Sequence, residues 1–267
     1  MKYISPGGWF SLEYPATWSE FEDTEESFLF YNPNQWNGNF RISAFKGAKD
    51  YGKQCIDYEL KNNPTSSLVK IGTWDCAYSA ESFQEEGNWY TTHIWVTGKD
   101  NISFECSFTI AKDGDRTQAE EIIRTLNIRT GKEGKEIIPI RVLEIGEVNI
   151  AFEWVSTTIK KTLTKDFTSQ EADIEKLQKL VDGGKIQTNQ RTTWESIGLA
   201  FGTILENEMD GMTWVSVIDG SREYPALQFK GLLFEPAYLV WNKVKTNQTL
   251  DLKAEFAHIK HKVEELL

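Results

Sequence analysis

The segment NISFECSFTI, residues 101–110, constrains the fold of this chain most strongly. Apolar side chains occupy its even positions from 102 to 110 and polar ones the odd positions between them. This period of two is typical of a β-strand with one face on a hydrophobic core. The short turn GKDN at 98–101 precedes it, which predicts antiparallel pairing with the strand before.

Further strands and two helices are expected in the same half of the chain. The run WFSLEY at 9–14 alternates in the same way and stops at Pro15. The other predicted strands begin at residues 27, 39, 74 and 89, and helices are predicted over 50–61 and from Thr117, where Glu120 completes capping-box spacing. A sheet with one covered face and two helices indicates an α+β layer.

The second half has a different, mainly helical pattern. Helices are predicted over 144–163, 168–180 and 191–208 and in two closing segments, with Thr168 and Glu171 as a second capping box. Three short strands lie between them, the first two joined by Asp219-Gly220, a dipeptide typical of a type I′ hairpin turn. We therefore expect a helix-rich domain with a small antiparallel sheet.

Length and composition favour two soluble domains. A chain of 267 residues exceeds the usual size of one core, and 40% hydrophobic with 13% aromatic residues argues against disorder. The segment RTGKEGKEIIP joins the halves, so we place a first domain at 1–130, a linker at 131–139 and a second domain at 140–267. The predicted fold class is α+β in both domains.

Charge, hydropathy and cysteine content bear on the partner and on the cellular location. The net charge is −11 and no basic patch is present, so we expect no nucleic-acid partner. No apolar run is long enough to insert in a membrane, and no signal peptide is visible, although one removed before residue 1 would leave no trace. Three scattered cysteines, at 55, 76 and 106, indicate neither a disulfide framework nor a zinc site, which favours the cytoplasm.

Three stretches of the first half resemble the PsbP/MOG superfamily: FSLEYPATW at 10–18, NISFECSFTI, and AEEIIRTLNI at 119–128. The resemblance implies an antiparallel sheet flanked by helices, with Trp18 folded back as a lid over the end of the sheet. The second half, particularly residues 194–227, resembles a bacterial domain of uncharacterised function. Neither resemblance supplies catalytic residues, since this superfamily is chiefly known for binding and assembly.

Two surfaces are candidate binding sites. Trp36 lies at the tip of the loop YNPNQWNGNF, where a large apolar side chain gains little unless something covers it, either its own protein or a partner. Asn34 and Asn37 would orient a partner there. The second surface is the hairpin end, with Arg222 and Tyr224 as anchors and Asp219 as a polar group, because Trp, Tyr and Arg dominate binding energies.

No pattern indicates a cofactor or a metal. His258 and His261 are three residues apart on a predicted helix but lack further ligands, and a solvated helix face explains them. His93 could face Glu105 on the next strand, as an acid and base or as a polar cross-strand pair. Gly198 and Gly202 in one helix predict close approach of another element, or of a ligand.

The functional expectation is a non-catalytic binding or assembly module with another protein as partner. Two alternatives stay open: an immunity-type inhibitor of a partner enzyme, and a hydrolase that uses carboxylates near the hairpin. The carboxylates considered for hydrolysis are Glu195, Glu206, Glu208, Asp210, Asp219 and Glu223. The sequence leaves the oligomeric state open.

Overall fold

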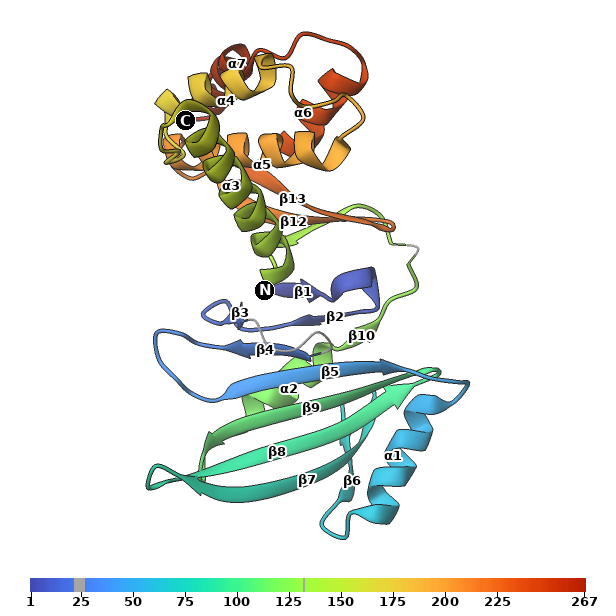
Figure 1. The fold of residues 1–267 in the computed structure, drawn as a ribbon. Helices are drawn as coiled ribbons and strands as arrows, with labels where there is room; N and C mark the ends of the chain where they lie inside the picture. Colours follow the sequence, from blue (N-terminus) through green and yellow to red (C-terminus); the bar gives the residue numbers. More distant parts are fainter. Residues whose placement is uncertain (22–26, 132) are drawn as a thin grey trace. The chain divides into compact units, whose positions relative to one another are not determined.

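The computed structural model describes residues 1–21, 27–131 and 133–267 and divides into two compact units, Met1–Glu133 and Gly134–Leu267 (Figure 1). The boundary between the units falls inside the stretch predicted as a linker. Each unit has its own hydrophobic core.

A seven-stranded antiparallel sheet forms the body of the first unit. Its strands in spatial order are β3 (Ser19–Phe21), β4 (Ser27–Tyr31), β5 (Asn39–Lys46), β9 (Ile102–Ala111), β8 (Asn88–Lys99), β7 (Trp74–Glu85) and β6 (Ser67–Ile71). The alternation in β9 is confirmed, because Phe104, Cys106 and Phe108 are fully buried while Glu105 is exposed. The predicted antiparallel hairpin between β8 and β9 is also present.

A second, three-stranded sheet covers the same core. It consists of β1 (Lys2–Ile4), β2 (Phe10–Glu13) and β10 (Asn127–Ile128), with the 3₁₀ turn η1 (Pro6–Gly8) between the first two. Strand β1 was not predicted, because three residues are too few to show a period. Trp18 is buried and stacks on Phe108 with ring centroids 6.4 Å apart, as the resemblance implied.

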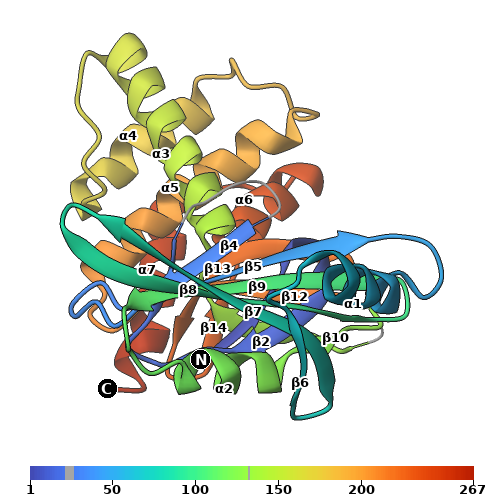
Figure 2. The same ribbon diagram turned by 90° about the horizontal axis from the view of Figure 1, so that it is seen from below.

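Two helices flank the large sheet of this unit on opposite faces (Figure 2). Helix α2 (Thr117–Thr125) buries Ala119, Ile122 and Ile123 in the core shared with β9. Helix α1 (Tyr51–Asn62) packs on β7, β8 and β9. The capping box predicted at Thr117 is wrong, because Thr117 is already helical and the Asp115 side chain accepts its backbone N–H at 2.9 Å.

The second unit contains a four-stranded antiparallel sheet. Its order is β11 (Glu136–Pro139), β12 (Thr213–Asp219), β13 (Arg222–Phe229) and β14 (Leu232–Phe234). The predicted hairpin turn is confirmed, with Asp219 opposite Arg222 and Gly220 at a φ of 62°. Residues 136–139 of the predicted linker are instead strand β11, because Ile138 is buried opposite Ser216 of β12.

Five α-helices enclose the larger core of the second unit. They are α3 (Val142–Leu163), α4 (Ile174–Asp182), α5 (Arg191–Glu208), α6 (Pro236–Lys245) and α7 (Leu252–Glu264). The capping box predicted at Thr168 and Glu171 is wrong, because the 3₁₀ turn η2 (Glu171–Asp173) leads into α4 and the reciprocal cap joins Gln170 and Asp173. Asp173 also accepts the backbone N–H of Thr168 at 2.6 Å, so one buried carboxylate binds the backbone of the segment that leads into α4.

Close helix packing explains the two glycines of α5. A Cβ added at Gly198 would lie 2.4 Å from the carbonyl oxygen of Pro236, and one at Gly202 would lie 2.5 Å from the Trp214 ring. The predicted close approach is confirmed, and the neighbour is the first turn of α6 together with β12. In the described part of the chain, no helix is both long and apolar enough to cross a membrane.

Candidate functional site

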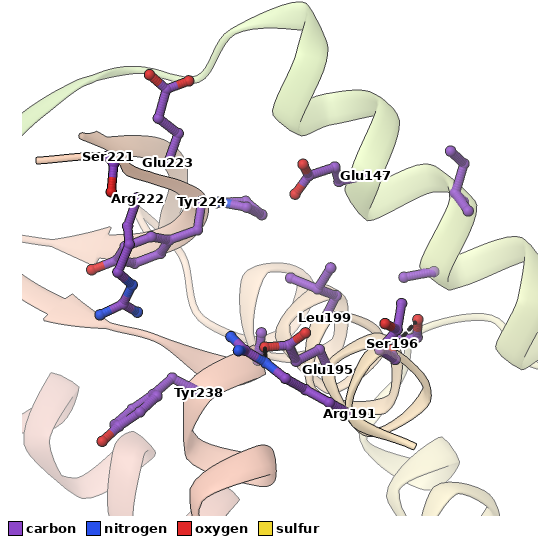
Figure 3. A pocket seen from close by; sticks show the side chains of 15 residues that line it. Glu147, Arg191, Glu195, Ser196, Leu199, Ser221, Arg222, Glu223, Tyr224 and Tyr238 are labelled. Carbon is purple, nitrogen blue, oxygen red and sulfur yellow. Dashed lines mark hydrogen bonds and ion pairs between the residues drawn. The ribbon is translucent and has the colours of Figure 1, made fainter. Parts of the chain in front are cut away.

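A pocket of about 540 Å³ lies within the second unit (Figure 3). Its walls come from α3, from the first half of α5, from the β12–β13 hairpin and from the first turn of α6. This volume is in the range typical of small-molecule sites. Both charged and apolar side chains line it.

Helix α3 forms one wall because of the way it packs. It buries Val148, Ala151 and Val155 on one stripe, so the flanking positions 147 and 150 lie beside the core at the pocket. Ile150 is 69% exposed, which is unusual for an isoleucine. Glu147 is accessible to solvent and points from α3 into the pocket (Figure 3).

The Glu147 carboxyl titrates above its usual range. Loss of hydration at the pocket wall, and then repulsion from Glu144, raise its pKa, while Arg141 opposes this. Glu195 and Glu223 add smaller repulsive effects. Three carboxylates and one guanidinium therefore act on Glu147, and the local potential at this wall is negative.

Helix α5 supplies the second wall, and its polar groups bond to each other. Arg191 Nε donates to Glu195 Oε1 at 2.8 Å, one helical turn away. Ser196 Oγ donates to the backbone carbonyl of Thr192 at 3.0 Å. Leu199, which is buried, supplies an apolar lining.

The hairpin wall carries Arg222 and Tyr224, whose side chains form a cation–π pair. The Arg222 guanidinium lies over the Tyr224 ring at 5.2 Å from its centroid. The Tyr224 hydroxyl donates to Glu235 Oε1 at 2.9 Å, and Lys135 Nζ donates to the same oxygen at 2.9 Å. Burial, and then the bond to Glu235, raise the pKa of Tyr224, so the phenol is neutral at pH 7.

A buried ion-pair cluster fixes the hairpin to α3. Arg141 Nε donates to Glu144 Oε2 at 2.8 Å, and its terminal nitrogen donates to Glu223 Oε2 at 3.0 Å. The Ser216 hydroxyl donates to Glu144 Oε2 at 2.7 Å. The cluster thus links the start of α3 to the hairpin, and removal of one partner would leave a buried charge unpaired, which is strongly destabilising.

Two of the three hairpin residues predicted from the sequence are at the pocket. Arg222 and Tyr224 line it, whereas Asp219 is exposed at the turn and is not among the lining residues. Sequence reasoning missed Glu147, Arg191 and Tyr238. An isoleucine at 150, off the apolar stripe of its helix, was an available signal, but nothing in the sequence relates this helix to a hairpin about 70 residues later.

The Trp36 loop belongs to the first unit, where Trp36 is 47% exposed. Its ring meets Tyr90 edge-on at 5.8 Å, and Tyr90 stacks on Phe83 at 5.7 Å. Asn37 Nδ2 donates to Gln118 at 3.2 Å, and the Asn34 backbone N–H donates to the Asn32 side chain at 2.9 Å. Trp36 is thus partly covered by its own unit, and Asn37 is tied to α2.

The other candidate groups are dispersed. His93 pairs with Phe108 rather than Glu105, so the predicted facing pair is wrong, and His93 Nδ1 instead bonds the Tyr78 hydroxyl at 2.8 Å. His261 Nε2 lies 3.5 Å from Glu265. Within residues 1–21, 27–131 and 133–267, no group of three His, Cys, Asp or Glu side chains is placed to hold a metal ion.

The six carboxylates considered for hydrolysis have different surroundings in the second unit. Glu195 and Glu223 line the pocket as members of ion pairs. Glu206 accepts from the Trp214 indole at 2.8 Å, and Glu208 accepts the backbone N–H of Glu171 at 2.9 Å. Asp210 and Asp219 are exposed.

Comparison with known proteins adds two domain families. Residues 1–149 match the model of a domain of unknown function, DUF3805, which is more than half of the chain. The chain belongs to the DUF3805 family. Residues 173–256 match a second domain of unknown function, DUF3806. The DUF3805 match extends past the first unit into α3.

A solved structure similar to this DUF3805 chain comes from Bacteroides thetaiotaomicron VPI-5482. It is 52% identical, with a TM-score of 0.95, and the match covers 97% of this chain and 98% of that one. No curated protein matches the chain.

Two further solved structures are similar to about half of the chain. The solution structure of cyanobacterial PsbP (CyanoP) from Synechocystis sp. PCC 6803 is 13% identical, with a TM-score of 0.27, over 48% of this chain and 92% of that one. The crystal structure of LpqN, involved in cell envelope biogenesis of Mycobacterium tuberculosis, is 16% identical, with a TM-score of 0.31, over 49% and 91%.

Proposed function

We propose that this chain is a non-catalytic binding or assembly module that holds a segment of a partner protein in the pocket of the second unit. One observation supports this above others: the pocket is formed, and its Ser196 and two of its three lining carboxylates bond to other groups of the protein. Ser196 donates to a backbone carbonyl, and Glu195 and Glu223 are held by guanidinium groups. Glu147, the third lining carboxylate, is outside these ion pairs, so hydrolysis would further require a nucleophile or water positioned beside it.

The rim of the pocket also suits a protein partner. Ile150 and Tyr238 are exposed, and the Arg222 guanidinium lies over the Tyr224 ring. Aromatic and arginine side chains around an apolar depression are typical of binding hot spots. The net charge of −11 supports a partner other than nucleic acid.

We propose the cytoplasm as the place of action. Support comes from the three cysteines, which are all free although two of them are buried. Burial raises the pKa of Cys76 to about 11, so its thiol is unreactive at pH 7.

The test compares the affinity of a partner for the wild-type chain and for two variants. A partner recovered with the wild-type chain would be purified, and its Kd measured against wild type, the pocket variant Arg222→Ala/Tyr238→Ala and the control Trp36→Ala. Both pocket residues are exposed, so the variant should fold. We expect about 10-fold or greater weakening in the pocket variant alone. Equal affinity of all three proteins would refute the proposal, and so would turnover of a substrate that the pocket variant abolishes.

A further inference from the structure

The charges that line the pocket of the second unit do not all cancel. Arg191 is paired with Glu195, and Glu223 is paired with Arg141 beneath the wall. Glu147 on α3 and Arg222 on the hairpin remain, and the ion pairs found among the described residues include neither. One negative and one positive group therefore face the same cavity from different walls (Figure 3).

Glu147 and Arg222 differ in their surroundings in a way that fits two ends of one ligand. Glu147 stands among carboxylates, so a cationic group beside it would relieve repulsion and replace lost hydration. Arg222 is supported by the Tyr224 ring, which leaves its N–H groups available for a carboxylate. Between the two walls the lining is apolar, with Ala151, Leu199 and Pro225.

Resting on the proposed function, we propose that the pocket binds a peptide-like zwitterion, with its cationic group at Glu147, its anionic group at Arg222 and an apolar side chain on the lining between them. Two sources share this chemistry. The charges can be the free amino and carboxyl ends of a short peptide, or the side chains of a lysine and a glutamate within a partner segment.

Calorimetric titration of the full chain can separate the two charges. The probes are the dipeptide Ala-Leu, its N-acetylated form, its C-terminal amide, and the capped tripeptide acetyl-Lys-Leu-Glu-amide. The proteins are wild type, Glu147→Gln, Arg222→Gln and the control Glu153→Gln, which changes an exposed glutamate of the same helix. Melting temperatures confirm that each variant is folded.

The proposal predicts that each protein variant and one modification of the peptide remove the same contact. Each pocket variant should weaken binding of Ala-Leu, or of the capped tripeptide, by about 10-fold, because one charge-assisted contact is lost. Acetylation should weaken binding by the same factor and abolish the effect of Glu147→Gln, while amidation should abolish the effect of Arg222→Gln. The control Glu153→Gln should bind as wild type does.

The outcomes also separate this inference from the proposed function. Binding of Ala-Leu that the pocket variants weaken would assign the two charges to free peptide ends. Binding of the capped tripeptide that they weaken would assign the charges to side chains. Absence of binding by both at millimolar concentration, or binding that neither variant changes, would overturn the zwitterion. The proposed function would still stand if a purified partner lost affinity for Arg222→Ala/Tyr238→Ala.

Discussion

Replacing Gly198 by alanine should destabilise the second unit, although alanine is the better helix former. The residue lies inside α5, and an added Cβ would sit 2.4 Å from the Pro236 carbonyl oxygen, 2.6 Å from the Ala237 Cα and 2.8 Å from the Pro236 carbonyl carbon. All three are backbone atoms of the start of α6, so no side-chain rotation can relieve the overlap. The helices must move apart.

The size of the effect follows from two opposing contributions. Alanine gains about 1 kcal/mol over glycine in a helix interior. Carbon atoms pack at about 3.5–4.0 Å, so α6 would have to shift by roughly 1 Å, and overpacking of this kind costs about 1–3 kcal/mol or more. We expect a net loss of up to about 2 kcal/mol.

The matched control is Gly146→Ala in α3. Gly146 is also inside a helix, but an added Cβ there meets no atom within 4 Å. This variant should gain about 0.5–1 kcal/mol from helix propensity alone. The two substitutions are chemically identical, so the difference between them isolates the contact with α6.

Urea unfolding, followed by tryptophan fluorescence and circular dichroism, measures both free energies. A separation of about 2 kcal/mol corresponds to roughly 6–10 °C in the melting temperature of a unit this size. The larger change Gly202→Leu should also lose about 1–3 kcal/mol by meeting the Trp214 ring. If Gly198→Ala were as stable as Gly146→Ala, the close approach of α5 and α6 would be refuted.

Three further predictions concern the surface and the pocket. Trp36→Ala should leave the melting temperature within a few degrees of wild type, because the side chain is half exposed; a large drop would show that the side chain belongs to the core. Limited proteolysis should cut first near Gly131 and Gly134, which are exposed between the two units, and first cuts inside either unit would contradict this boundary. Glu147 has a raised pKa, so the folded state holds its proton longer than the unfolded chain and the contribution of this group to stability falls as pH rises through the raised value. Glu147→Gln should therefore gain stability relative to wild type as the pH rises above the ordinary glutamate value of 4.5, whereas Glu153→Gln should show no such trend. The charged groups that act on Glu147 are Arg141, Glu144, Glu195 and Glu223.

Local patterns in the sequence predicted most elements because their causes are local. The alternation at 102–110 reports burial of one strand face, and Asp219-Gly220 reports a turn whose backbone favours glycine. The helix caps were predicted less well. Several polar residues near each helix start can accept the same N–H groups, so the local sequence does not decide among them. In the tertiary structure the acceptor is Asp115 at α2, and the cap at α4 is formed by Gln170 with Asp173.

The sequence by itself therefore determined the α+β class and most of the strands and helices, because the spacing of apolar residues along the chain reports local structure. The pocket was decided by tertiary structure alone. Glu147, Arg191 and Arg222 come from three elements far apart in sequence, and they face one cavity because the Arg141 cluster joins α3 to the hairpin and because Gly198 lets α6 approach α5. No periodicity encodes such a meeting, since each residue is locally an ordinary charged position on a helix or a strand.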